Sequence, residues 1–370
     1  MIMILYVALG VILGFVILIL LIWFWIKFKL RKFSSHLAEA LSNMGGAGVP
    51  PLRIELEKNN ELEWTDFSKK KTTTEALERL GYRVTGSFDS YAPVHVKMLG
   101  FKNSDLPGFA LIYEVDQANA FYLDLVCEMS DETQITVSTA PDDGMDHPEF
   151  SQMIRMDHLN LSDESHVNEL HNRMLEEIAG KTVVDHTDKS FEEVFKKSWA
   201  RTMDWRIERG GITTEEVMRV SAKEGRTDLS DEEIEMVKQP WKQEISYFID
   251  EQIRKNYLKE TNMSGDEWEE TVDRIFIVHE RSDVESIISE LADTISYSDD
   301  FDEDDDLYER TENQLKSLFD SADSIMDGFH RALDLLPADK KYSLHGSTNH
   351  PWKGEIYLSP PYDDYEDEDY

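Results

Sequence analysis

A short acidic loop holds the densest set of side chains in this chain that could do chemistry. Residues 142–148 read DDGMDHP and follow an alternating run that predicts a strand. A carboxylate and an imidazole this close together can transfer protons, and loops at the ends of sheets often carry binding residues. Asp143, Asp146 and His147 are therefore candidate groups for a hydrolase or transferase. The alternative is a plain surface turn.

Three other patterns resemble chemical sites, and each favours a structural role. His166 and His171 are five residues apart, so a helix would place them about 140° from each other and prevent both from binding one zinc ion. Cys127 falls on an apolar strand face, where burial raises the pKa of a thiol and makes it inert. In the acidic run 299–306, an EF-hand frame fails at its glycine and at its final glutamate. We predict no catalytic residue, no metal site and no cofactor.

A second polar set comes from the strand expected at 120–130. One set of alternating residues in this run is apolar, and we expect that face to be buried. Tyr122, Asp124 and Glu128 belong to the other face. Together with the acidic loop they make up the candidate binding surface. Its residues are Tyr122, Asp124, Glu128, Asp143, Asp146 and His147.

A sheet is needed to position these side chains. Five runs of alternating apolar and polar residues predict its strands. The runs are 82–89, 94–101, 109–116, 120–130 and 135–140. Short connections between them suit antiparallel neighbours. The sequence therefore predicts an α+β domain at 51–160, in which flanking helices close one face of an antiparallel meander of about five strands.

The next region, residues 161–336, predicts an α-helical region. Three capping boxes mark helix starts, because each box satisfies two backbone donors at the helix terminus. The boxes pair Thr213 with Glu216, Ser230 with Glu233, and Ser264 with Glu267. Pro240 predicts a kink or a new helix start. Within this region, the acidic residues 298–306 predict a solvated linker.

Acidic residues dominate the composition. The chain has 75 Asp and Glu against 38 Lys and Arg, which gives a net charge of -37 at pH 7. Such a surface repels phosphate backbones, so we expect no nucleic-acid partner and favour basic protein partners instead. Residues 337–370 end in a dense acidic run without periodicity and predict a disordered acidic tail.

The first 26 residues predict a transmembrane helix. Residues 2–26 contain no charged side chain, and a helix of this length can cross the hydrocarbon core of a bilayer. A cleaved signal peptide fits less well, because the apolar run is too long and no basic residue precedes it. Four basic residues and then a Gly- and Pro-rich stretch follow, so residues 27–50 predict a basic juxtamembrane segment and a flexible stalk.

The same residues predict an orientation. Basic residues beside a membrane span remain in the cytoplasm, which places the N-terminus outside and the C-terminal domain in the cytoplasm. The expected location is the cell inner membrane, with a single-pass signal-anchor. Gly10 and Gly14 form a pair of small residues on one helix face, which would allow two spanning helices to pair as a homodimer. Two glycines tolerated in lipid are the alternative.

Five short runs extend from the sheet to the helical region. They are ALIYE at 110–114, LDL at 123–125, TVSTAP at 136–141, DHP at 146–148 and MDWR at 203–206. Together they resemble a recurring pattern in uncharacterised bacterial membrane-anchored proteins. The resemblance covers about a third of the chain, and it implies no activity because none is assigned to those proteins.

Taken together, these patterns favour an interaction or scaffold protein at the inner face of the membrane, without chemistry of its own. The acidic composition and the failed chemical motifs support this expectation. Two alternatives stay open. One is a membrane-tethered hydrolase or transferase that uses the 142–148 loop, and the other is a sensory domain whose sheet binds a small ligand.

Overall fold

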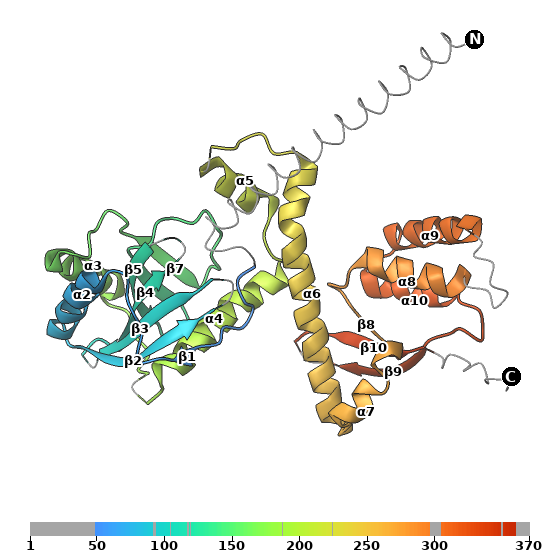
Figure 1. Ribbon diagram of the computed structural model, residues 1–370, viewed down its shortest axis with the longest axis horizontal. Coiled ribbons are helices and arrows are strands. Elements are labelled where there is room, and N and C mark those ends of the chain that lie inside the picture. Colours follow the sequence, from blue (N-terminus) through green and yellow to red (C-terminus); the bar gives the residue numbers. More distant parts are fainter. Residues whose placement is uncertain are drawn as a thin grey trace, which may run out of the picture. The chain divides into compact units, whose positions relative to one another are not determined.

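Two compact units make up the described part of the chain (Figure 1). The computed structural model describes residues 49–359, with gaps at 92–93, 104, 117, 119, 187, 224, 297–304 and 349–350. The first unit comprises the described residues up to Trp205 together with Thr214–Ile234. The second comprises Arg206–Thr213 and the described residues from Glu235 onward.

The first unit is built on a seven-stranded sheet whose strands follow one another in chain order. The strands are β1 (Glu57–Lys58), β2 (Tyr82–Ser90), β3 (Val96–Asn103), β4 (Gly108–Val115), β5 (Ala120–Glu128), β6 (Gln134–Ser138) and β7 (Ser151–Arg155). Every neighbouring pair is antiparallel except β6 and β7, which run parallel. The short connections explain the antiparallel pairs, since a chain that reverses over a few residues must return alongside the strand it left.

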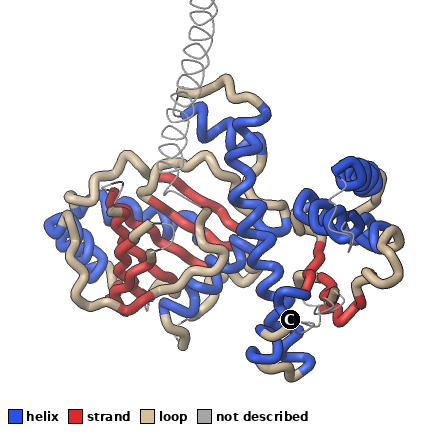
Figure 2. Tube along the Cα trace, turned by 45° about the vertical axis from the view of Figure 1, so that its right-hand side comes forward, coloured by secondary structure: helices blue, strands red, loops and turns tan. Residues whose placement is uncertain are grey.

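Helices cover both faces of this sheet (Figure 2). They are α2 (Phe67–Arg79) and α3 (Glu164–Ile178) on one face and α4 (Phe191–Glu208) on the other, while α5 (Thr214–Lys223) contacts the loop that follows β6. The main core lies between the sheet and α2 and α3, where Leu77, Leu125 and Leu170 are fully buried. On the opposite face, the aromatic stripe that begins at Phe191 on α4 packs over β2, β3 and β4.

The close fit of α4 depends on a glycine in the middle of the sheet. A Cβ added at Gly100 on β3 would lie 2.7 Å from Cδ1 of Phe191. Phe191 also stacks on Phe88, with 5.6 Å between the ring centroids. The absence of a side chain at Gly100 therefore lets the first aromatic ring of α4 rest directly on the strand backbone.

The second unit combines helices with a small antiparallel sheet of order β8-β10-β9. Its elements are α6 (Asp231–Thr261, of which the residues from Glu235 belong here), α7 (Gly265–Glu269), the 3₁₀ turn η1 (Val272–Arg274), β8 (Ile275–His279), α8 (Val284–Ser296), α9 (Asp305–Asp320), α10 (Ile325–Leu333), β9 (Ser343–Thr348) and β10 (Gly354–Leu358). A core of its own forms around Leu291, Leu315 and Phe329.

The predicted α+β class with an antiparallel sheet is confirmed, and the details differ at the sheet edges. The described residues form nine α-helices and a seven-stranded, mostly antiparallel sheet, whereas the sequence predicts about five strands. Strands β1 and β7 were not predicted, because two residues are too few to show alternation and SQMIR carries none. The predicted buried face of β5 is confirmed, since Leu123, Leu125 and Cys127 all lie in the main core.

The region after residue 336 differs from its prediction. The sequence predicts disorder there, but Ser343–Thr348 and Gly354–Leu358 form β9 and β10, of which β10 pairs with β8 on one side and with β9 on the other. The partner of β10, strand β8, lies more than sixty residues earlier in the chain, and a local sequence pattern does not report such pairing. The helical region likewise contains a strand, β8, that the prediction lacks.

Helix starts follow the predicted capping pattern, and Pro240 lies inside a helix rather than at the start of a new one. Ser264 and Glu267 form the complete capping box. Ser230 and Glu233 exchange the same pair of hydrogen bonds, at 2.8 and 3.3 Å. Pro240 neither starts nor ends a helix, because α6 continues through it. The lost backbone hydrogen bond is offset by buried residues on either side, including Val237 and Trp241.

The predicted membrane architecture needs correction. Within the described residues, none of the helices is both long enough and apolar enough to cross a membrane. The longest of them, α6, has 31 residues but carries charged side chains along its length. This finding contradicts the transmembrane, signal-anchor and inner-membrane predictions, and we do not carry them further. The residues on which they depended, 1–26 with Gly10 and Gly14, lie outside the described residues, as does the stalk up to residue 48.

Candidate functional site

Asp124, the central residue of the predicted surface, lies inside a polar network on the sheet. It sits on β5 opposite Ser138 on β6, and the Ser138 hydroxyl donates a hydrogen bond of 2.5 Å to its carboxylate. Burial raises the pKa of Asp124 from 3.8 to about 6, although the hydrogen bond from Ser138 and the positive charge of Arg155 oppose the rise. Tyr122, on the same face, packs against Tyr113 with 5.4 Å between the ring centroids.

The acidic loop at 142–148 is fastened to helix α5. The backbone N–H of Asp146 donates to the buried carboxylate of Glu216, at 2.7 Å. Arg219 donates to the carbonyl of Gly144 at 3.0 Å and forms an ion pair with Asp146. Lys223 donates to the carbonyl of Asp142 at 2.9 Å. Several contacts to one helix hold the loop in place, so Asp146 serves to anchor the loop.

Arg155 brings the remaining two loop residues together. Its guanidinium lies 3.5 Å from the Asp143 carboxylate and 3.4 Å from Nε2 of His147. The same positive charge acts on Asp124. The structure thus gathers Asp124, Asp143 and His147 near one arginine, while Tyr122 lies on the same sheet face and packs against Tyr113. The sequence prediction did not include Arg155, because its strand β7 shows no alternation.

Glu128 lies apart from this group. It accepts a hydrogen bond of 2.7 Å from Nε2 of His186, a buried residue just before α4. Along β5 it is four residues from Asp124, at the end of the sheet where α4 begins. The predicted surface therefore divides into a cluster around Arg155, a loop anchor at Asp146 and a separate pair formed by Glu128 and His186.

Ser138 and Cys127 are side chains of nucleophilic type on β6 and β5, near the cluster around Arg155. The Ser138 hydroxyl keeps its proton and donates a hydrogen bond to the Asp124 carboxylate. Cys127 is buried, and burial raises the pKa of its thiol to about 12. Within the described residues, His, Cys, Asp and Glu side chains do not form a group of three or more that could hold a metal ion. The arrangement therefore holds polar groups in place around Arg155 and pairs the Ser138 hydroxyl with the Asp124 carboxylate.

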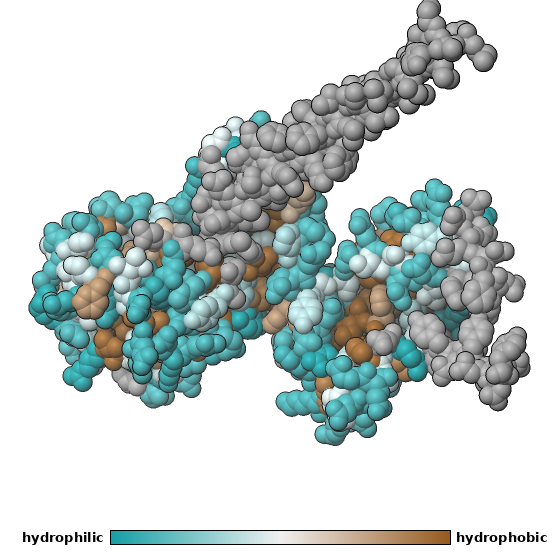
Figure 3. All heavy atoms as spheres, in the orientation of Figure 1, coloured by the Kyte–Doolittle hydropathy of each residue, from teal (hydrophilic) through white to brown (hydrophobic). Residues whose placement is uncertain are grey.

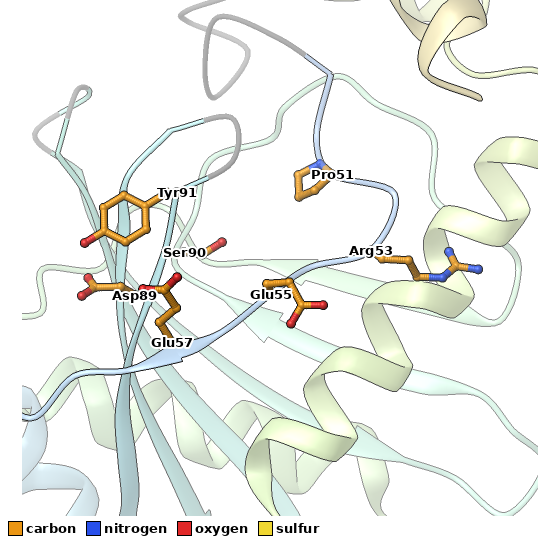
Figure 4. Close-up of a pocket in the computed structure, with 7 residues that line it drawn as sticks. All are labelled: Pro51, Arg53, Glu55, Glu57, Asp89, Ser90 and Tyr91. Carbon is orange, nitrogen blue, oxygen red and sulfur yellow. The ribbon is translucent and has the colours of Figure 1, made fainter. Parts of the chain in front are cut away.

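A separate pocket lies at the β1 edge of the sheet, and the sequence prediction missed it (Figure 4). Its volume is about 180 Å³. We call it the edge pocket. Its lining residues are Pro51, Arg53, Glu55, Glu57, Asp89, Ser90 and Tyr91. Since small-molecule sites usually measure about 300–1,000 Å³, a cavity of this size suits one side chain rather than a metabolite.

Negative charge prevails in the edge pocket. Three carboxylates line it against one guanidinium. Arg53 points away from Glu57 and Asp89 (Figure 4) and pairs with Asp204 on α4, at 2.5 Å. Glu55 is largely exposed and pairs with Lys196, also on α4, at 2.9 Å. The positive charge of Arg53 is thus drawn out of the pocket, and Glu57 and Asp89 face the space beneath Tyr91.

Asp89 and Tyr91 are held in place by a neighbouring histidine. The Asp89 carboxylate is buried and accepts hydrogen bonds from Asn59 at 2.6 Å and from His95 at 2.7 Å. The Tyr91 ring is 61% exposed and stacks on the His95 imidazole, with 4.7 Å between centroids and 10° between planes. An exposed aromatic ring above carboxylates is an arrangement that attracts cations.

A chain of charged groups continues from His95 into the sheet. The other ring nitrogen of His95 lies 2.6 Å from Asp116, which in turn pairs with Lys97 at 2.7 Å. Lys97 also pairs with the buried Glu114 at 3.0 Å. Burial opposes the charge on His95, but the hydrogen bonds to Asp89 and Asp116 outweigh it and raise the pKa of His95 above its usual value of 6.5.

One sequence signal could have found this pocket. Residues 52–57 read LRIELE, in which Leu52, Ile54 and Leu56 are buried and the intervening charged residues face outward. This is strict alternation, but only its last position is hydrogen-bonded as a strand. Partners such as Asp89 and His95 come from a hairpin thirty or more residues later, and the pairing of Glu57 with Asp89 brings them near.

Comparison of the chain with protein-family models, with curated proteins and with solved structures found no match. The resemblance in the five short runs therefore stays an interpretation of those residues.

Proposed function

We propose that this chain is a protein-interaction module without chemistry of its own, which binds a basic segment of a partner protein at the edge pocket. One observation carries the proposal. Glu57 and Asp89 converge beneath the exposed ring of Tyr91 in a cavity of about 180 Å³, and Arg53 is drawn away by Asp204. Such a pocket complements one arginine or lysine side chain in both size and charge.

The whole chain favours the same class of partner. Its net charge of -37 would attract a basic segment over a distance of about one Debye length before contact. The visible face of the first unit is also largely hydrophilic (Figure 3), which suits polar recognition better than a broad apolar interface. The pocket would then select for a cationic side chain at one position of the segment.

The test is a titration of the full chain with a dye-labelled pentapeptide that has blocked ends and one central arginine. The matched peptide carries citrulline, which keeps the shape of arginine but has no charge. We expect the arginine peptide to bind at least about five-fold more tightly by fluorescence anisotropy, because charge-assisted contacts are worth about 1 kcal/mol or more. Equal affinity for both peptides would refute the proposal.

Variants of the lining locate the binding site. Glu57→Gln and Tyr91→Ala should each weaken arginine-peptide binding about two- to five-fold, since exposed ion pairs and cation–π contacts are each worth about 0.5–1 kcal/mol. The matched control is Glu63→Gln, which removes the same charge from an exposed position outside the lining. A loss of affinity that is equal in the control would mean that only the overall charge matters.

The enzymatic alternative has less support. A hydrolase or transferase that uses the histidine of the 142–148 loop as a base needs a nucleophile beside it, and the His147 imidazole faces Arg155 while Ser138 donates to Asp124. Small-ligand sensing would need space between sheet and helices, where Leu77, Leu125 and Leu170 are fully buried in a continuous core. We therefore propose binding alone.

A further inference from the structure

We propose that a proton on His95 and a cationic side chain in the edge pocket compete with each other, so that the module releases its partner as the pH falls. This inference rests on the proposed function, because it concerns the regulation of the same pocket. His95 contacts the lining residue Asp89 and stacks on the ring of the lining residue Tyr91.

Both ring nitrogens of His95 face carboxylate oxygens. Nε2 lies 2.7 Å from Asp89 and Nδ1 lies 2.6 Å from Asp116. A carboxylate can only accept, so both contacts are hydrogen bonds only when both nitrogens carry a proton. The charged imidazolium therefore satisfies the whole arrangement, and the neutral ring leaves one nitrogen lone pair facing an oxygen.

The charged form of His95 reduces the negative charge that the pocket presents. It shares the Asp89 carboxylate, which is one of the two groups beneath Tyr91. An arriving guanidinium would meet the same carboxylate from the cavity side, with the imidazolium on the other side repelling it. Loss of the His95 proton removes that repulsion, so binding becomes stronger.

Other titratable groups face His95 from the strands packed around it. Glu114 lies on β4, and Asp116 follows that strand. Burial would raise the pKa values of both carboxyl groups, but hydrogen bonds, including those from Lys97, lower them. Despite burial, hydrogen bonds to Asp116 and Glu114 raise the pKa of Lys97 on β3. The remaining neighbours are Glu57 on β1, Asp89 on β2, and Tyr91, which directly follows β2. The negative charges of Asp89 and Glu57 hold the phenol pKa of Tyr91 above its usual value.

Reciprocity gives the expected size of the effect. If protonation of His95 changes peptide affinity by a certain factor, the bound peptide must shift the protonation equilibrium of His95 by the same factor. Because the His95 side chain is partly exposed, we take the lower end of typical couplings, about five-fold. Peptide affinity should therefore rise about five-fold as the pH increases through the titration of His95.

The experiment repeats the arginine-peptide titration with the full chain from about pH 6 to about pH 9. Blocked peptide ends and the very high pKa of arginine keep the charge of the probe constant over this range. His95→Gln should bind at the level that the wild-type chain reaches at high pH, with no pH dependence. His158→Gln is the matched control, since His158 is an exposed histidine of the same unit, and it should retain the wild-type profile.

A second measurement does not depend on any variant. NMR titration of His95 in the wild-type chain should show its pKa fall by about 0.7 when the arginine peptide is saturating, which is the five-fold factor on a logarithmic scale. Arginine-dependent binding with a flat pH profile, or an unchanged His95 titration, would overturn the inference while leaving the proposed function intact. Absence of arginine-dependent binding at every pH would instead refute the proposed function itself.

Discussion

At the scale of single residues, Asp124 is the clearest case of a carboxylate whose burial in the folded state costs free energy. It is half-buried between β4 and β6, with Ser138 as its hydrogen-bond donor and Arg155 as the nearby cation. Because burial raises its pKa from 3.8 to about 6, the folded state holds the Asp124 proton more tightly than the unfolded state does. Asp124 therefore favours folding most below about pH 4, and this contribution is lost as the pH rises to about 6.

Asp124→Asn should remove this pH dependence. The amide has no proton to lose, so the free energy of unfolding at pH 7 should rise by about 1–3 kcal/mol relative to the wild-type chain, with little change at pH 4. Urea unfolding at a series of pH values measures the difference. Asp157→Asn, at an exposed position of the same unit, should leave the profile unchanged. A variant at residue 124 that keeps the wild-type slope between pH 4 and 6 would contradict this account.

At the scale of elements, the position of α4 depends on Gly100. Gly100→Ala should destabilise the first unit by about 1–3 kcal/mol, because the added methyl group would press on the Phe191 ring. Chemical denaturation gives the cost. Gly265→Ala is the control, since a Cβ there would have nothing within 4 Å. Adding Phe191→Leu to Gly100→Ala should recover part of the loss. Independent, additive effects of the two substitutions would show that they do not share a contact.

The helices and strands also show which features of the fold a local sequence pattern can predict. The alternating run at 120–130 predicted strand β5, its buried face and the inert position of Cys127, because one strand and its burial are properties of neighbouring residues. The capping boxes at Ser230 and Ser264 predicted helix starts for the same reason. Strand β10 was missed, because its formation depends on pairing with residues far away in the chain.

In the candidate site, too, the sequence predicted the residues of local segments but not the partners that distant pairing brings to them. The sequence singled out Asp124 and the 142–148 loop, and the structure places Asp143, His147 and Asp124 around one arginine. It could not name Arg155, which reaches the loop only because β7 pairs in parallel with β6. The edge pocket was also missed, because its two carboxylates beneath Tyr91 come from strands that meet through non-local pairing.

At the scale of the whole molecule, the net charge of -37 sets the response to salt. Like charges in such excess repel one another more in the compact state than in the expanded one. We therefore expect the melting temperature to rise by a few degrees when NaCl is raised from about 20 mM to about 200 mM, as screening shortens the range of repulsion to about one Debye length. Differential scanning calorimetry measures this shift. A melting temperature that falls with salt would mean that ion pairs such as Lys97–Glu114 outweigh the general repulsion.

The two-residue strand β1 has a consequence for behaviour at high concentration. Among the described residues it is one edge strand of the seven-stranded sheet, and its exposed side chains are Glu57 and Lys58. A long, flat, apolar edge strand offers a template onto which another copy can add and begin a fibril. An edge strand this short and charged offers few unpaired backbone N–H and C=O groups and an unfavourable surface for stacking, so it protects the protein from polymerising through that side of the sheet.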